Sequence, residues 1–316
     1  MKAFILAAGY GTRLRPLTHY IPKPLIPVLN VPAICYTLML LKEAGVDTVI
    51  CNVHHHADRL RSYLREGRDF GMDIHISQER DILGTGGGLK QCEQLLDDGP
   101  FLLVNSDIIA DFDLSAAASA HCSSGNSGTL ILFETPSAKT IGDVGIHGGK
   151  VVDFRNMLHS GHRSNRIYAG AAVLDPSIFR YLSPGFSSIV DTGFTGLISE
   201  NSLGFFLHGG FWQDIGSPQS FWAANTISAE PLLNRFQTMN RLFGTGPDRI
   251  ADTCVISRSA TVRGSVVGPG CRISDGALVE QAVILPGTVI EKNRIVRKEI
   301  VFPEGTLSIG GTTADG

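Results

Sequence analysis

The sequence LAAGYGTRLRP, residues 6–16, decides how this chain begins to fold. It continues from the apolar run 2–6, which has the length and composition of a buried strand. Small residues with two glycines, Gly9 and Gly11, follow this run. Glycine lets backbone N–H groups converge on an anion because it has no Cβ. Thr12, Arg13 and Arg15 add a hydroxyl and two positive charges beside the turn. The stretch therefore predicts a strand that ends in a phosphate-binding loop.

Two common glycine-rich motifs do not fit this loop. The dinucleotide fingerprint G-x-G-x-x-G would need a third glycine where Leu14 stands, and Pro16 disfavours the helix that should follow. The Walker string G-x-x-x-x-G-K-[ST] does not occur. A further cation, Lys23, stands between Pro22 and Pro24, which restrict the backbone around it. This pattern indicates a positioned lysine beside the phosphate loop.

The motif LAAGxGTRLRPLT followed by PKPLxPV, from Leu6 to Val28, resembles the signature of the sugar-1-phosphate nucleotidylyltransferases, also called nucleotide-sugar pyrophosphorylases. The loop TGGG is similar to that of a bacterial branch that includes N-acetylmuramate 1-phosphate uridylyltransferases and mannose-1-phosphate guanylyltransferase-like proteins. The resemblance implies Mg²⁺-dependent transfer of a nucleotidyl group from an NTP to a sugar 1-phosphate. UTP or GTP with an N-acetylmuramate-, mannose- or glucose-type 1-phosphate are the substrates it favours. A non-catalytic regulatory subunit that binds a nucleotide sugar is the alternative.

The composition is typical of a globular protein with a substantial core. The chain has 316 residues, 43% hydrophobic and 18% charged, which suggests two domains. A net charge of −3 gives no sign of nucleic-acid binding. We expect a cytoplasmic protein without a membrane segment, because no apolar stretch is long enough for a signal peptide or a span. The six cysteines form no C-x-x-C pair and are expected as free thiols.

Up to residue 230, short apolar runs alternate with longer helical patterns. This alternation predicts an α/β fold, a Rossmann-like and mostly parallel sheet with helices on both faces. We expect a mobile loop over residues 158–165, which are rich in Gly, His and Ser. The expected strands are 2–6, 48–53, 72–76, 101–104, 129–133, 150–154 and 168–174, and the expected helices are 32–44, 56–67 and 86–96.

After residue 231 the pattern changes, and aromatic residues almost vanish beyond Gly244. Apolar residues instead recur every five or six positions: Ile256, Val262, Val267, Ile273, Val279, Ile284, Ile290 and Val296. This period predicts a short left-handed parallel β-helix of hexapeptide turns. The expected domains are a catalytic domain over 1–230, a linking helix within 231–250, the β-helix over 251–308 and a disordered tail over 309–316. The last histidine is His208, so an acyltransferase β-helix with a histidine base is not expected, and we expect a packing role or a homo-oligomer contact.

The resemblance also assigns the nucleotide site. Backbone amides of the first loop and Arg13 would hold the β- and γ-phosphates, and Lys23 would lie near the α-phosphate. The loop with GTGGG would lie against the base, with Glu79, five positions before its first glycine, accepting from uracil, thymine or guanine. The nucleotide-binding residues implied are Leu6, Ala7, Ala8, Gly9, Gly11, Thr12, Arg13, Lys23, Glu79, Gly84, Thr85 and Gly86.

Metal binding is expected at two aspartates. Asp107 follows the apolar run 101–104, and ligands of open parallel sheets bind beyond the carboxyl ends of the strands. Asp214 stands in the string GFWQDIGSP, and the resemblance implies that both aspartates hold Mg²⁺, which prefers carboxylate oxygens. Arg13, Lys23 and Asp107 are the expected catalytic residues.

The sugar pocket is expected around Tyr168, Gly170 and Arg155. The string YAGA matches the strand whose glycine lies against the sugar in the family. Many members carry Glu-Lys-Pro after the preceding strand, but this chain has FRNM there, and Arg155 would favour an anionic or bulkier substituent. The run His54–His56 is interpreted as a polar loop or helix start, because consecutive side chains of a strand cannot all face one metal.

Overall fold

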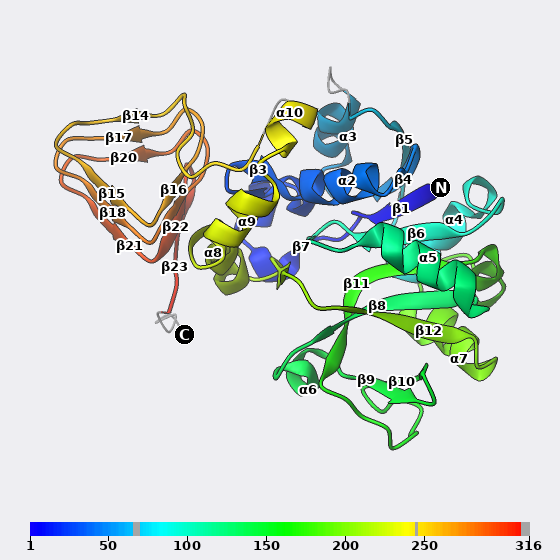
Figure 1. The fold of residues 1–316 in the computed structure, drawn as a ribbon. Helices are drawn as coiled ribbons and strands as arrows, with labels where there is room; N and C mark the ends of the chain where they lie inside the picture. Colours follow the sequence, from blue (N-terminus) through cyan, green and yellow to red (C-terminus); the bar gives the residue numbers. More distant parts are fainter. Residues whose placement is uncertain (66–69, 244–245, 311–316) are drawn as a thin grey trace. The chain divides into compact units, whose positions relative to one another are not determined.

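The computed structural model describes residues 1–65, 70–243 and 246–310 of the chain (Figure 1). The chain divides into two compact units. The first unit comprises Met1–Tyr10 and Thr37–Trp212, and the second comprises Gly11–Tyr36 and Gln213–Gly316. Helix α2 (Ala33–Glu43) and strand β13 (Trp212–Asp214) each begin in one unit and end in the other.

A seven-stranded sheet forms the first unit, in the order β12-β8-β11-β6-β1-β4-β5. Neighbouring strands are parallel except β11, which runs antiparallel to both β6 and β8. The prediction of a Rossmann-like, mostly parallel sheet is confirmed. The strands are β1 (Lys2–Leu6), β4 (Thr48–Val53), β5 (Asp73–Gln78), β6 (Phe101–Asn105), β8 (Gly128–Glu134), β11 (Arg166–Leu174) and β12 (Leu203–His208).

The central strands are buried on both faces, as expected for a parallel sheet covered by helices. Ala3, Phe4 and Ile5 of β1 have no exposed surface. Helices and turns packed against the sheet include α3 (Ala57–Arg65), α4 (Gly84–Gln91), η3 (Glu93–Leu95), α5 (Leu114–Ser124), α6 (Ala138–Ile141), η4 (Pro176–Tyr181), η5 (Val190–Phe194) and α7 (Thr195–Ser199). The expected helix 86–96 is two elements, because α4 ends at Gln91 and a 3-10 turn follows. Residues 66 and 67 of the expected helix 56–67 lie outside the described part of the chain.

The segment 150–154 does not join the large sheet. It forms β10 (Lys150–Phe154), which pairs antiparallel with β9 (Val144–His147). The passage 158–165, expected as a mobile loop, is tied to this hairpin, because the Asp153 carboxylate accepts hydrogen bonds from the N–H groups of Leu158 and Ser160 at 3.0 Å. Burial opposes ionisation of Asp153, but these hydrogen bonds lower its pKa below the usual value.

The second unit contains short elements from both ends of the chain. Its early part has η1 (Thr12–Leu14), α1 (Leu17–Tyr20), η2 (Lys23–Leu25), β2 (Pro27–Val28) and β3 (Val31–Pro32). Three helices, α8 (Pro218–Thr226), α9 (Ala229–Arg235) and α10 (Met239–Phe243), precede the β-helix. The single linking helix expected from residue 231 is therefore wrong, since α9 ends at Arg235 and α10 begins at Met239.

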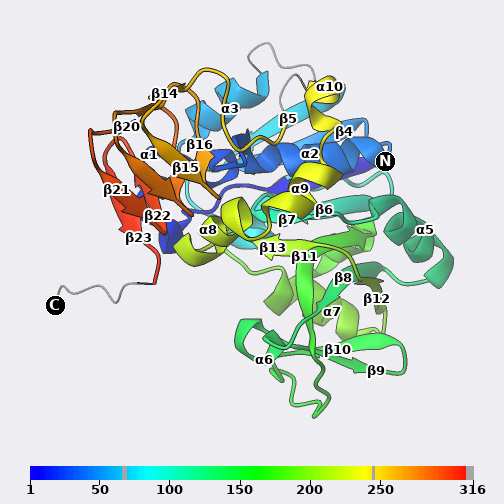
Figure 2. The ribbon, with the colours of Figure 1, turned by 60° about the vertical axis from the view of Figure 1, so that its left-hand side comes forward.

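A parallel β-helix completes the second unit, as the sequence predicts (Figures 1 and 2). Equivalent strands pair in register, Ile256 with Ile273 and Ile273 with Ile290, so each coil advances by 17 residues. A coil of 17 residues is one residue shorter than three hexapeptides. One of its three turns therefore has five residues, which explains the steps of five in the apolar repeat. The repeat residues from Val267 to Val296 are at most 1% exposed and form a continuous core.

The β-helix strands are β14 (Val255–Ile256), β15 (Thr261–Arg263), β16 (Val266–Val267), β17 (Arg272–Ile273), β18 (Leu278–Glu280), β19 (Val283–Ile284), β20 (Val289–Ile290), β21 (Ile295–Arg297), β22 (Glu299–Phe302) and β23 (Gly305–Ser308). Strand β23 runs antiparallel to β22 and ends the stack. Of the tail expected over 309–316, residues 311–316 lie outside the described part. Within the described ranges, no helix has both the length and the apolar character needed to cross a membrane.

Candidate active site

The loop after β1 is held at its first residue by a buried asparagine. Asn52 lies on β4, is 1% exposed, and accepts a hydrogen bond from the Ala7 N–H at 2.8 Å through Oδ1. Ala7 and Ala8 are buried, whereas Gly9 and Tyr10 are exposed. A Cβ on Gly9 would meet no atom within 4 Å, so the loop is open on that side. The phosphate-binding role that the glycine pattern predicts stays a prediction, and the space beside Gly9 is compatible with it.

The continuation of the loop lies in the second unit and brings two predicted residues together. Gly11 has a φ of +62°, a left-handed conformation that favours glycine, and the η1 turn follows it. Nη1 of Arg13 lies 3.7 Å from Oδ2 of Asp214. Gly216 makes this contact feasible, because a Cβ there would come within 2.5 Å of the Arg13 guanidinium and 2.7 Å of the Asp214 carboxylate. The arginine is thus held near an aspartate by a close backbone turn.

Lys23 lies beside the same glycine. A Cβ on Gly11 would come within 3.3 Å of Cβ of Lys23 and 2.7 Å of the Thr18 methyl group. Thr18 donates a hydrogen bond from Oγ1 to the Gly11 carbonyl at 3.0 Å. Within the second unit, the aliphatic part of the Lys23 side chain therefore lies against the turn at Gly11.

Asp107 follows the carboxyl end of β6 in the first unit, as predicted. The preceding residue, Ser106, is 3% exposed and donates from Oγ to the Leu6 carbonyl at 2.7 Å. This bond ties the end of β6 to the end of β1 and places the half-buried Asp107 in the turn after them. In the described ranges no three His, Cys, Asp or Glu side chains form a metal cluster. One carboxylate such as that of Asp107 still suits Mg²⁺, which takes few protein ligands together with phosphates and water.

The side chain of Glu79 is bonded within the protein. It is 2% exposed, and Oε1 accepts from Nδ2 of Asn52 at 2.7 Å while Oε2 accepts from the Leu83 N–H at 2.9 Å. The carboxylate therefore shapes the segment 79–83 that leads into α4. The sequence predicts a contact of this carboxylate with the base, whereas in the structure both of its oxygens accept hydrogen bonds from the protein.

The glycines of the GTGGG loop mainly serve packing against residues 185–189. A Cβ on Gly87 would overlap the Gly185 carbonyl oxygen, and one on Gly84 would lie 2.5 Å from the Ser187 carbonyl oxygen. Gly86 donates its N–H to that same Ser187 carbonyl at 2.8 Å. Thr85 is also engaged, since its Oγ1 accepts from the N–H of Ile189 at 2.9 Å. The glycines thus allow two backbone segments to touch, a role beyond the ring approach that the sequence suggests.

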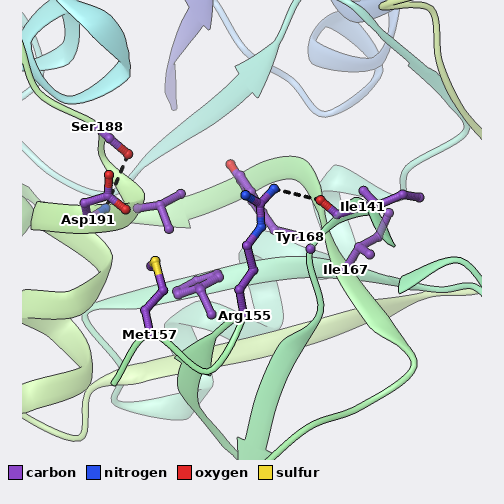
Figure 3. A pocket seen from close by; sticks show the side chains of 10 residues that line it. Ile141, Arg155, Met157, Ile167, Tyr168, Ser188 and Asp191 are labelled. Atoms are coloured by element: carbon purple, nitrogen blue, oxygen red, sulfur yellow. Dashed lines mark hydrogen bonds between the residues drawn. The ribbon is translucent and has the colours of Figure 1, made fainter. Parts of the chain in front are cut away.

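A pocket of about 380 Å³ opens in the first unit near two of the three predicted sugar residues (Figure 3). Arg155 and Tyr168 line it. Gly170 does not, and its φ of +87° instead brings its backbone against Asn105 and Ile108. The lining residues are Ile141, Gly142, Phe154, Arg155, Met157, Ile167, Tyr168, Ser188, Val190 and Asp191.

Polar groups stand on two sides of this pocket. Arg155 donates from Nη2 to the Ile141 carbonyl at 2.7 Å, and within the described ranges it has no carboxylate partner. The Tyr168 hydroxyl is buried without a hydrogen-bond partner in the same ranges, and burial raises the pKa of Tyr168 so that it stays a donor. Asp191 and Ser188 line the other side and are bonded to each other through the Asp191 N–H at 3.3 Å. The pocket thus has the Arg155 guanidinium on one side and the Ser188 and Asp191 side chains on the other, while the Tyr168 hydroxyl itself is buried, and this polar lining suits a polyhydroxylated ligand.

Asn52 and Ser106 hold the ends of the loop segments in place, and the sequence analysis did not single them out. An asparagine inside the apolar run 48–53 was the available signal, because a buried amide requires partners. Those partners, Ala7 and Glu79, lie 45 and 27 residues away in the sequence. Only the parallel pairing of β1, β4 and β5 brings them within reach.

Comparison with known families gives two matches along the chain. Residues 2–230 match the family described as Nucleotidyl transferase. Residues 245–310 match the GlmU-like, C-terminal hexapeptide family. The two matches cover the large sheet and the β-helix, respectively.

Curated relatives include the mannose-1-phosphate guanyltransferase 2 of Candida glabrata, 34% identical over 244 residues, and the mannose-1-phosphate guanyltransferase of Gibberella zeae, 33% identical over 252 residues. Each match covers 74% of this chain and 66% of the relative, so the chain spans a little under two thirds of their length. Among solved structures, a putative glucose-1-phosphate thymidylyltransferase from Bacillus anthracis superposes with a TM-score of 0.65 at 23% identity, over 71% of this chain and 94% of the other. That likeness establishes the fold.

Proposed function

The chain belongs to the nucleotidyl transferase family, and we propose that it transfers a nucleotidyl group from an NTP to a sugar 1-phosphate, releasing pyrophosphate. The observation that carries this proposal is the loop after β1. Its backbone is open at Gly9, is anchored through Ala7 by Asn52, and continues into the turn that holds Arg13. A loop of this kind suits a polyphosphate.

In the proposed reaction a phosphate oxygen of the sugar 1-phosphate attacks the α-phosphorus of the NTP. The new P–O bond forms as the bond between the α-phosphorus and its bridging oxygen to the β-phosphate breaks, and the electron pair leaves with pyrophosphate. No covalent enzyme intermediate or general base is needed, because the nucleophile is already an anion. Arg13 and Lys23 would stabilise the charge that spreads onto the leaving group.

Asp107 and Asp214 are the residues proposed to hold Mg²⁺. Both offer hard carboxylate oxygens, and each follows or ends a strand whose neighbours fix the backbone. When bound, the ion would neutralise phosphate charge during the displacement. Nη1 of Arg13 lies 3.7 Å from Oδ2 of Asp214, so in this proposal the arginine lies beside the carboxylate that would hold the ion.

The nucleotide is proposed to be UTP or GTP, lying between the first loop and the segment 79–86. The buried Glu79 carboxylate keeps that segment in shape, so base recognition falls to its backbone and to the edge of Gly84 and Thr85. The nucleotide residues implied by the motif, from Leu6 to Arg13 and Lys23, are retained in this proposal. Because NTPs are cytoplasmic metabolites, we place the reaction in the cytoplasm.

The sugar is proposed to occupy the pocket of Arg155 and Tyr168, next to Gly170. The relatives named as mannose-1-phosphate guanyltransferases favour mannose 1-phosphate as the first compound to try. Arg155 adds a guanidinium that has no carboxylate partner among the described residues, which suits an N-acetylmuramate-type substrate with its extra carboxylate. Glucose 1-phosphate, whose sugar ring carries no charged group besides the phosphate, is the reference compound.

The test is pyrophosphate release with UTP and GTP against these three sugar phosphates and Mg²⁺. We expect turnover with at least one pair, and we expect Asp107→Asn to abolish it while thermal unfolding stays unchanged. A folded, Mg²⁺-loaded protein that is inert with all pairs but binds the nucleotide sugar would support the regulatory-subunit alternative. Turnover by Asp107→Asn at the normal rate would remove that aspartate from the mechanism.

We further propose that the β-helix contributes to a homo-oligomer. Val255 on β14 and Val289 on β20 belong to the same sheet of the β-helix and are 60% and 47% exposed, which is unusual for large apolar side chains on strands. Light scattering of the wild type and of Val255→Lys would test this, with a smaller particle expected for the variant. An unchanged mass would remove this face from the assembly.

A further inference from the structure

We propose that His54 is a positioning residue that fixes the phosphate loop against the nucleobase segment. The assignment of those two regions rests on the proposed function, but the contacts do not. His54 directly follows β4, and its ring lies between two partners in the first unit. Nδ1 lies 3.1 Å from the Glu79 carbonyl oxygen, and Nε2 lies 3.1 Å from the Tyr10 hydroxyl.

The two contacts fix the proton arrangement of the ring. A carbonyl oxygen only accepts, so Nδ1 carries the proton in the bond to Glu79. In the neutral ring Nε2 is then an acceptor, and the Tyr10 hydroxyl donates to it. His54 therefore works as a relay with one donor and one acceptor, each aimed at a different loop.

Tyr10 is a partly exposed residue whose ring contacts the histidine run. Its neighbours in the chain are Gly9 and Gly11, which have no side chains to pack against it. Tyr10 is 39% exposed, and its ring meets that of His54 edge-on at 5.2 Å and that of His55 at 5.8 Å. The histidine run thus supplies the packing and the hydrogen bond that limit the motion of the phosphate loop at this residue.

His54 links Tyr10 of the phosphate loop to Glu79, just as Asn52 links Ala7, the first residue of that loop, to Glu79. Asn52 joins the Ala7 N–H to the Glu79 carboxylate, and His54 joins the Tyr10 hydroxyl to the Glu79 carbonyl. The two residues are two positions apart in an extended chain, so their side chains point to the same side. The end of β4 therefore bridges both loops twice. This arrangement holds the triphosphate and base subsites in register, so loss of the outer bridge should weaken nucleotide binding without affecting the sugar.

The experiment is a double-mutant cycle with Tyr10→Phe and His54→Phe. Each change keeps an aromatic ring and removes the hydrogen bond between the two residues. For Tyr10→Phe, which removes one neutral hydrogen bond, we expect about threefold to tenfold weaker NTP binding by calorimetry and a matching rise in KM for NTP. His54→Phe also removes the bond to the Glu79 carbonyl and should weaken NTP binding at least as much. KM for the sugar 1-phosphate should stay within about twofold, and the double variant should resemble His54→Phe alone, because both changes break the same bond.

The matched control is His75→Gln, which removes an exposed imidazole paired with Asp73 on β5 and should leave NTP binding unchanged. A readout independent of turnover is the imidazole ¹⁵N spectrum, in which His54 should be the Nδ1-protonated tautomer and should shift in Tyr10→Phe. If NTP binds but no pair of substrates reacts, the proposed function fails while weaker binding by both variants still supports the positioning role. Wild-type NTP binding by Tyr10→Phe, or effects of the two changes that simply multiply, would overturn it.

Discussion

Replacing Asn52 by alanine should destabilise the first unit more than its single side chain suggests. The amide makes two hydrogen bonds at 2.8 and 2.7 Å in a fully buried position, one to a backbone N–H and one to a carboxylate. Removing it leaves both partners buried and unsatisfied, at about 1–3 kcal/mol each and more for the charged group. We therefore expect a loss of about 3–5 kcal/mol in the free energy of unfolding, together with weaker NTP binding.

Urea denaturation followed by tryptophan fluorescence can measure this loss. The chain has two tryptophans, Trp212 in the first unit and Trp222 in the second, so a Trp222→Phe background reports the first unit alone. The matched control is Asn165→Ala, since Asn165 is exposed and makes one side-chain bond, to Glu134 at 2.8 Å. That variant should change stability by less than about 0.5 kcal/mol. An Asn52→Ala loss no larger than that of the control would refute the reasoning.

The variant Asn52→Asp should make the stability of the protein depend on pH at the same site. It keeps an acceptor for Ala7 but places a second carboxylate within hydrogen-bond distance of Glu79. Two buried carboxylates this close share one proton, so the pKa of the pair rises above the unfolded values. The folded state then binds more protons than the unfolded state, and the variant should gain stability relative to wild type as the pH falls from about 8 to about 5. If the variant were less stable than wild type by the same free energy of unfolding across this pH range, the two carboxylates would not share a proton.

Three other changes test separate parts of the chain. Gly88→Ala would bring a Cβ onto Oε1 of Glu79, so we expect a clear drop in the thermal midpoint of the first unit and weaker NTP binding. Ile284→Ala removes a fully buried side chain of the β-helix core and should cost about 2–5 kcal/mol in unfolding of the second unit, followed by Trp222 fluorescence. The hydrogen bonds from Arg163 lower the pKa of Asp143, so its stabilisation is present above the unfolded carboxyl pKa and is lost as the pH falls below about 4. Asp143→Asn should therefore be less stable than wild type at pH 7 and should approach it in acid, as measured by thermal unfolding across pH.

Much of the fold was predictable because its signals are local. A short stretch of sequence is enough to predict the loop at residues 6–16 and each parallel strand. The same holds for the β-helix, which follows from the spacing of Ile273, Ile284 and Ile290. Strand β12 and helix α5 were missed, since α5 is rich in small residues and its apolar periodicity is weak. The role of each site residue was harder to predict from the sequence. Whether Glu79 faces a ligand or the protein depends on hydrogen bonds to residues that are far away in the sequence.

The common feature of these missed contacts is their place at the strand ends. A parallel ladder satisfies backbone groups only while both strands continue, and the first groups beyond it need other partners. Here Ser106 and Asn52 supply those partners. Ser106 donates to the Leu6 carbonyl at the end of β1 from both its N–H, at 3.2 Å, and its Oγ, and Asn52 accepts from the next N–H, that of Ala7. The loop after β1 is therefore fixed from both neighbouring strands, so the anion binding that we propose for the N–H groups beyond Ala7 would cost little in ordering. Loss of either side chain should accordingly affect nucleotide binding before it affects the sugar pocket.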